Sequence, residues 1–171
     1  MNDISRSYLA ARAALPPTRL VPAWLALALD AEFGEQAGAI AALWIARHPA
    51  VVREDGSTGI DDRHEEYGDL LELLLESAAT SSTHTVAIAR WIALSCFGED
   101  HLWEDLGLPE RPALGALIAR HFPALHARNV HNLRWKKFFY KQLCDRAQVR
   151  ACRAPSCAEC SEYAGCFEGA A

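Results

Sequence analysis

The chain has 171 residues, of which 51% are hydrophobic and 23% are charged, a composition typical of a globular protein. Ten glycines and eight prolines are too few for a fibrous or disordered chain, and the length suffices to bury one core without disulfides. The longest apolar run, residues 20–29, is too short to span a membrane, and residues 1–17 lack the apolar segment of a signal peptide. We therefore expect a cytoplasmic protein, in which clustered cysteines serve as metal ligands or redox groups rather than disulfides.

Charge is distributed unevenly along the chain, although the net charge is only −5. Residues 120–153 contain nine Lys or Arg and one acid, Asp145, so this stretch carries +8 and the remainder −13. The same stretch holds His121, His126 and His131. A negatively charged ligand or partner near this end is the natural inference.

Helical patterns dominate, and no segment alternates with period two for more than a few residues. The first half predicts helices over 5–15, from Pro22 to Phe33 and over 37–47, followed by a polar loop over 51–59. Asp61 or Asp62 should cap a fourth helix that runs through Ala79, and Ser81 or Ser82 should cap a fifth over 83–97. In the fourth of these, the predicted buried positions are Leu70, Leu71, Leu74 and Leu75. Cys96 lies in an apolar run and is expected in the core.

The second half begins after Gly98 with a turn-rich segment, GEDHLWEDLGLPERP. Pro112 should open a helix that ends near Phe122, and Pro123 the longest helix, to about Cys144. The overall prediction is an all-α fold of six or seven helices in a single domain over 1–171. Its parts would be N-terminal helices (1–97), motif-bearing helices (98–151) and an irregular cysteine-rich tail (152–171).

The segment HLWEDLGL allows two interpretations. His101, Glu104 and Asp105 lie close enough along the chain to form an acid/base or metal group. Alternatively, the segment is a capping turn that places Leu102, Trp103 and Leu106 in the core. The capping turn is the more common use of such residues.

Four cysteines close the chain in the pattern C-x4-C-x2-C-x5-C: Cys152, Cys157, Cys160 and Cys166. Structural zinc sites usually bring two CxxC pairs together across a longer loop, whereas compact runs of this kind are typical of iron-sulfur clusters. The spacing therefore favours iron-sulfur over zinc or a redox role, with all four thiolates as ligands. Cys144, eight residues before this run, is a buried helical thiol or an additional ligand.

The segment NLRWKKFFYKQLC places Trp135, Phe139 and Leu143 on one helical face and basic residues on another. In a purely structural interpretation, the apolar face packs against the core and the basic face is exposed to solvent. The +8 charge beside a thiolate cluster also suggests attraction of an oxyanion or docking on an acidic partner. The candidate anion-attracting residues are Arg134, Lys137, Lys141 and His131. Nucleic acid is not expected as a ligand, because the chain is acidic overall and has no recognised DNA- or RNA-binding module.

Three linked motifs resemble the NifQ family of nitrogenase iron-molybdenum cofactor biosynthesis: HLWEDLGLPERPALGALIARHFPAL, then NLRWKKFFYKQLC, then the four-cysteine run followed by Phe167. The resemblance covers about residues 98–168. One departure is Arg134, where the family usually has an aliphatic residue before WKKFFY.

The resemblance implies a metallochaperone and not an enzyme. It would hold a 4Fe-4S or molybdenum-iron-sulfur cluster on Cys152, Cys157, Cys160 and Cys166, process molybdate and donate molybdenum for cofactor assembly. The partners it implies are the NifEN scaffold and NifH, with no membrane involved.

Three rival functions remain open on the sequence alone. They are a zinc-stabilised helical interaction module, an iron-sulfur electron-transfer protein and an enzyme. The absence of a phosphate-binding loop, a nucleophile elbow or a dinucleotide-binding fingerprint argues against the third.

Overall fold

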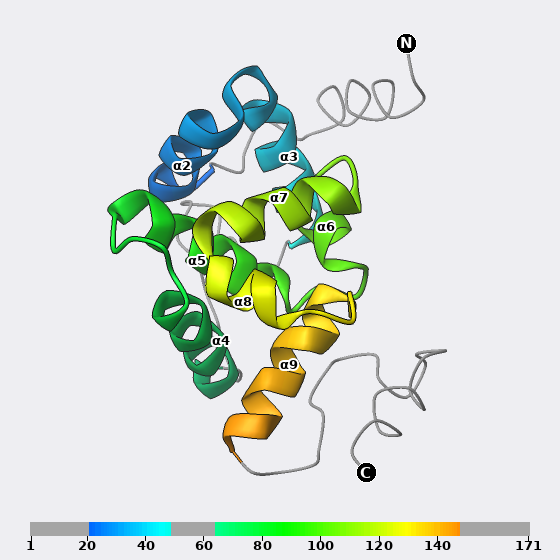
Figure 1. The fold of residues 1–171 in the computed structure, drawn as a ribbon. Helices are drawn as coiled ribbons and strands as arrows, with labels where there is room; N and C mark the ends of the chain where they lie inside the picture. The colour runs from blue at the N-terminus through cyan, green and yellow to red at the C-terminus, as the bar shows by residue number, and fades with distance from the viewer. Residues whose placement is uncertain (1–20, 49–63, 148–171) are drawn as a thin grey trace.

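The computed structural model describes residues 21–48 and 64–147, and within these ranges the chain is helical and contains no strand. The predicted all-α fold is therefore confirmed. Six helices have eleven or more residues, and they pack as an irregular bundle in which α7 crosses the middle and α4 and α9 lie side by side at one end (Figure 1). The predicted helix over 5–15, the loop over 51–59 and the Asp61 or Asp62 cap lie outside the described residues.

The first described helices match the predicted ones closely. Helix α2 spans Ala23–Phe33 after Pro22, whose fixed φ suits a helix start, and it ends at Gly34 with a φ of 53°. A short 3-10 helix, η1 (Gly34–Gln36), leads into α3 (Ala37–Arg47). Helices α2 and α3 pack against each other.

Helix α4 spans His64–Glu76 and α5 spans Thr83–Ser95. Ser82 caps α5, since its Oγ accepts a hydrogen bond of 3.1 Å from the backbone N–H of Thr85. The predicted end of α4 at Ala79 is wrong. The Ala79 N–H leaves the helix and donates to the carbonyl of His121 at 2.8 Å, so tertiary contact ends α4 early.

Two further details of these helices differ from prediction. The buried leucines of α4 are Leu70, Leu73 and Leu74, whereas Leu75 is exposed, so the apolar stripe runs one position away from the predicted one. Helix α5 ends at Ser95 and not at Phe97, because the N–H groups of Phe97 and Gly98 donate to carbonyls three residues back and tighten the last turn.

The single long helix predicted from Pro123 to Cys144 is wrong. After α6 (Leu102–Asp105) and α7 (Arg111–His121), the chain forms α8 (Pro123–Arg128) and then α9 (Trp135–Arg146). Between them, the Asn129 Oδ1 accepts from the Leu133 N–H at 2.8 Å, and Asn132 has a φ of 50°. Asparagine competes with the helix for backbone hydrogen bonds and tolerates the left-handed region, so the two asparagines separate α8 from α9.

Helix α5 lies at the centre of the core and packs against α2, α4 and α6. It is buried nearly all round, as expected for a helix enclosed by others. Trp44 of α3 donates to Ser95 Oγ at 2.9 Å, and Ser95 Oγ donates to the Trp91 carbonyl at 2.7 Å. Cys96 is fully buried, which confirms its predicted place in the core.

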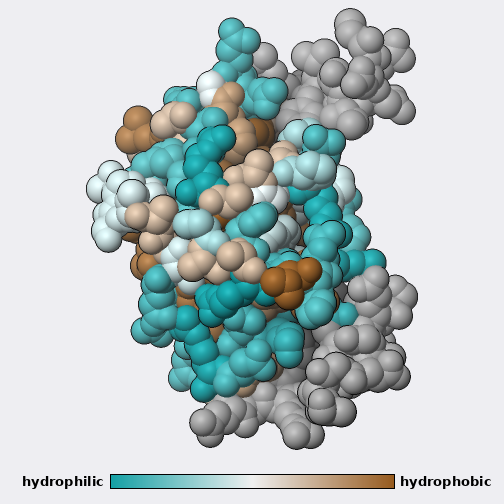
Figure 2. All heavy atoms as spheres, in the orientation of Figure 1, coloured by the Kyte–Doolittle hydropathy of each residue, from teal (hydrophilic) through white to brown (hydrophobic). Residues whose placement is uncertain are grey.

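The face shown in Figure 2 is mostly hydrophilic and is interrupted by isolated apolar side chains rather than one continuous patch. Among the described residues, the large hydrophobic side chains that are exposed are Leu27, Leu75 and Val130. No helix among the described residues has both the length and the apolar character needed to cross a membrane.

Candidate functional site

The four cysteines of the C-terminal run lie outside the described residues, so their ligand role stays a prediction. Cys144 lies in the last turn of α9 and is half-buried. Burial raises the pKa of the Cys96 thiol to about 12, which keeps it protonated and unsuited to metal binding.

The predicted anion-attracting residues do not form one solvated face. Lys137 is buried and Arg134 is half-buried at the start of α9, so the interpretation of a solvated basic face is wrong for Lys137. Lys141 is exposed and lies 3.8 Å from the Asp145 carboxylate, and His131 is exposed in the turn before α9. The contribution of these four residues to anion attraction remains a prediction.

Instead, a neighbouring lysine joins two of the sequence motifs in the interior. Lys136 of α9 forms an ion pair with Asp105 of α6, and the two side chains are 13% and 3% exposed. The Lys136 ammonium also donates to the carbonyls of Gly98 and Asp100, each at 2.7 Å. These three acceptors match the three donors of an ammonium group, so the buried charge is satisfied.

Two glycines make room for this arrangement. A Cβ at Gly98 would overlap the carboxyl group of Asp105. At Gly107, φ is 72° and a Cβ would lie 2.8 Å from the Ile40 carbonyl oxygen, so the turn after α6 presses directly on α3. Close packing therefore requires glycine both before α6, at Gly98, and after it, at Gly107.

The capping-turn interpretation of HLWEDLGL agrees with the structure. The Glu104 carboxylate accepts a hydrogen bond of 3.2 Å from the His101 N–H at the start of α6, while Leu102 and Leu106 are buried. Trp103 is partly buried against the core. Within residues 21–48 and 64–147, His101, Glu104 and Asp105 do not form a group of converging metal donors.

His48, the residue that follows α3, contacts α6 through the backbone of Asp105. Its Nε2–H donates to the Asp105 carbonyl at 2.8 Å, and its ring lies 5.6 Å from that of Trp44. Burial lowers the pKa of His48 more than this hydrogen bond and the Asp105 carboxylate raise it, and Lys136 and Arg47 lower it further. The buried imidazole is thus held neutral.

This lowered pKa predicts acid sensitivity. The unfolded chain binds a proton at His48 more readily than the folded protein, so the stability contributed by neutral His48 is fully present above its unfolded pKa of about 6.5 and is lost as pH falls below it. His48→Gln keeps an N–H donor but does not titrate. We expect the free energy of unfolding in urea to fall less in the variant than in the parent between about pH 7.5 and about pH 5.5. An equal fall in both proteins would contradict this role.

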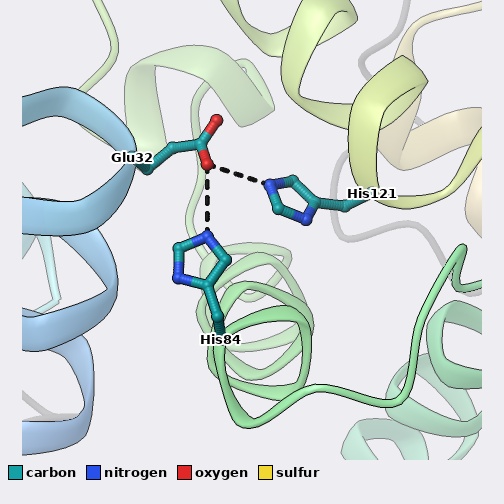
Figure 3. Close-up of side chains that lie close together, drawn as sticks. All are labelled: Glu32, His84 and His121. Carbon is teal, nitrogen blue, oxygen red and sulfur yellow. Dashed lines mark hydrogen bonds and ion pairs between the residues drawn. The ribbon is translucent and has the colours of Figure 1, made fainter.

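A second cluster, unanticipated from the sequence, joins three helices. Glu32 of α2 accepts hydrogen bonds at one carboxylate oxygen, Oε2, from His121 Nε2 at 3.0 Å and from His84 Nε2 at 3.2 Å (Figure 3). Arg120 pairs with the other oxygen, Oε1. The Glu32 and His121 side chains are 7% and 8% exposed, and His84 is 30% exposed.

Electrostatics in this cluster favour a charged carboxylate. Burial by itself raises the pKa of Glu32, but the hydrogen bonds from His121 and His84, together with the charge of Arg120, outweigh it and hold that pKa below its ordinary value. Glu32 is therefore an anion at neutral pH.

The sequence carried a weak signal for this cluster. Each of the three residues lies on the same face of its helix as buried apolar residues, at a spacing of three, four or seven positions. These buried neighbours are Leu25 and Leu29 for Glu32, Leu114 and Leu117 for His121, and Ile88 and Trp91 for His84. A titratable residue on a buried stripe requires a partner. The partners lie 52 and 89 positions away, so no local spacing identifies them.

Comparison with known proteins identifies relatives of the chain. Residues 19–168 match the model of the NifQ family. Protein NifQ of Azotobacter vinelandii is 44% identical over 108 residues, which are 63% of this chain and 55% of that protein. Protein NifQ of Rhodobacter capsulatus is 45% identical over 95 residues, 56% of this chain and 53% of that protein. Protein NifQ of Klebsiella pneumoniae is 49% identical over 82 residues, 47% of this chain and 49% of that protein.

The chain thus aligns with about half the length of these relatives. No solved structure matches it. The match to the family model includes both motif segments and all four C-terminal cysteines. The chain therefore belongs to the NifQ family, the family of nitrogenase iron-molybdenum cofactor biosynthesis.

Proposed function

We propose that this protein is an iron-sulfur metallochaperone of the cytoplasm that processes molybdate and donates molybdenum for iron-molybdenum cofactor biosynthesis. The observation that carries the proposal is the family match over residues 19–168, which extends through Cys152, Cys157, Cys160 and Cys166. The protein acts as a carrier and not as an enzyme with turnover. Its acceptors are the NifEN scaffold and NifH.

The donor set fits the cluster chemically. Four thiolates in one compact run suit an iron-sulfur cluster, and soft sulfur ligands suit molybdenum held among sulfides. When bound, the cluster supplies the iron and sulfide framework into which molybdenum is received. The chain's own role is to keep the four thiols deprotonated and converging, which the lysines and arginines over residues 120–153 favour.

Charge in this stretch also bears on how molybdate is attracted. Molybdate is a dianion. Lys141 is exposed in the middle of α9, and His131 is exposed in the turn that precedes this helix. Arg134, half-buried at the start of α9, adds positive charge between them. Because Lys137 is buried, we expect its contribution to be a longer-range one, through the field rather than contact.

Metal analysis of anaerobically purified protein tests this function. The Cys157→Ala/Cys160→Ala variant should contain neither iron nor molybdenum, because removal of two of four ligands leaves the cluster without support. Ser156→Ala/Ser161→Ala, two substitutions in the same tail, is the matched control and should retain both metals. Full metal content in a Cys144→Ser variant would exclude Cys144 as a ligand, and reduced iron would identify it as a fifth ligand.

The same analysis separates the rival functions. Zinc in place of iron would establish the zinc-stabilised interaction module. Iron without molybdenum, after growth with molybdate, would establish the electron-transfer protein. Either result would overturn the proposed carrier function.

A further inference from the structure

We propose that Glu32, His84 and His121 form a second metal site, for a divalent transition-metal cation of the Zn²⁺ or Fe²⁺ type. The site is built from α2, α5 and α7 and uses none of the cysteines. It is therefore independent of the proposed iron-sulfur function.

The distances suit a shared cation. In a tetrahedral site with metal–ligand bonds of about 2.0–2.1 Å, neighbouring donor atoms lie about 3.3 Å apart. The Glu32 Oε2 atom lies 3.0 Å from His121 Nε2 and 3.2 Å from His84 Nε2, and all three donors lie within 4.8 Å of one another. Replacement of the two shared protons by one cation thus requires small movements.

The donor types select the class of ion. Two imidazoles and one carboxylate suit borderline cations such as Zn²⁺ and Fe²⁺, whereas Mg²⁺ and Ca²⁺ prefer sites made of oxygen atoms. The Glu32 carboxylate would offset part of the charge of a divalent cation at this position. Since His84 is 30% exposed, the remaining coordination position opens toward solvent on its side.

The surroundings orient the ligands. Glu32 directs Oε2 at the two histidines (Figure 3). Arg120 pairs with the other oxygen, Oε1, which is the role of a supporting residue behind a metal-bound carboxylate. The His121 carbonyl accepts from the Ala79 N–H at 2.8 Å and fixes the end of α7. The His84 and His121 rings lie 5.2 Å apart, so both are positioned before any ion arrives.

Titration with Co²⁺ tests the site. The full chain with Cys152, Cys157, Cys160 and Cys166 replaced by Ala removes competing thiolates, and Co²⁺ reports its ligands by visible absorption. We expect one Co²⁺ per chain with nitrogen and oxygen ligands, displaced by Zn²⁺ but not by Mg²⁺. His84→Ala and His121→Ala should each lose this binding, and Arg120→Met should weaken it by about 10-fold or more.

His101→Ala, which removes an exposed histidine at the residue before α6, is the matched control and should bind Co²⁺ as the parent does. Circular dichroism verifies folding, and His84→Gln at the more exposed ligand keeps the test valid if His121→Ala fails to fold. Absence of Co²⁺ binding in the parent, or equal binding by the parent and His84→Gln, would overturn the site and leave a hydrogen-bonded cluster in its place. Because the cysteines are absent here, neither result bears on the iron-sulfur proposal.

Discussion

Replacing Lys136 with methionine is expected to lower the free energy of unfolding by about 3–5 kcal/mol, because it leaves the Asp105 carboxylate buried without its partner. The same change removes donors from the carbonyls of Gly98 and Asp100. Methionine keeps most of the volume of the lysine side chain, so lost packing contributes little. Chemical denaturation at neutral pH measures the effect.

Lys141→Met is the control on the same helix. Lys141 lies at 3.8 Å from Asp145, and both side chains are exposed, so we expect a change within about 0.5 kcal/mol. Asp105→Leu/Lys136→Met should be less destabilised than the sum of its single variants, because the pair is removed together. Equal, small effects of Lys136→Met and Lys141→Met would contradict a buried ion pair.

Substitution of Gly98 by alanine is expected to cost about 1–3 kcal/mol, the usual range for overpacking in a tight interior. The new Cβ would overlap the Asp105 carboxyl group, which Lys136 holds in place and which cannot move without breaking the ion pair. Thermal or chemical unfolding measures the loss.

Gly115→Ala is the control, and we expect it to stabilise the protein, whereas Gly98→Ala should destabilise it. Gly115 lies inside α7 with no atom within 4 Å of a built Cβ, so alanine should stabilise the helix by about 0.5–1 kcal/mol. The two glycine substitutions should therefore differ in sign. Stabilisation by Gly98→Ala would show that the turn before α6 has more room than this packing implies.

Much of the fold was predictable from local patterns. Pro22, Gly34 and Ser82 mark helix boundaries by their own backbone or side-chain chemistry, and the structure places the boundaries at those residues. The predicted burial of Cys96 followed from its apolar neighbours. Such features depend on residues close in sequence, which is why they can be read without the fold.

The predictions are wrong where contacts between residues distant in sequence determine a helix boundary or the burial of a side chain. Helix α4 ends early because the Ala79 N–H bonds to His121, and the predicted long helix divides because Asn129 and Asn132 fold the chain back between α8 and α9. Helical periodicity places Lys137 on a solvated basic face, whereas in the structure its side chain is buried. Helical periodicity gives the faces of a helix but not which neighbour covers each face.

The candidate sites also differ in whether a local sequence pattern predicts them. The cysteine run is a local sequence pattern, whereas the Glu32, His84 and His121 cluster is assembled from three helices that are distant in sequence. The Asp105–Lys136 pair shows that the HLWEDLGL and WKKFFY motifs are joined inside the fold. These motifs thus stabilise the helical body that precedes the cysteine run, a structural role that their charge alone did not indicate.

Delivery of molybdenum is the most direct test of the proposed carrier function. The anaerobically purified protein, loaded during growth with molybdate, is supplied as the sole molybdenum source to a cofactor synthesis reaction containing the NifEN scaffold and NifH. We predict cofactor formation with the parent protein and none with Cys157→Ala/Cys160→Ala. Cofactor formation at the parental level with the double variant would contradict the proposal that the four-cysteine run carries the molybdenum.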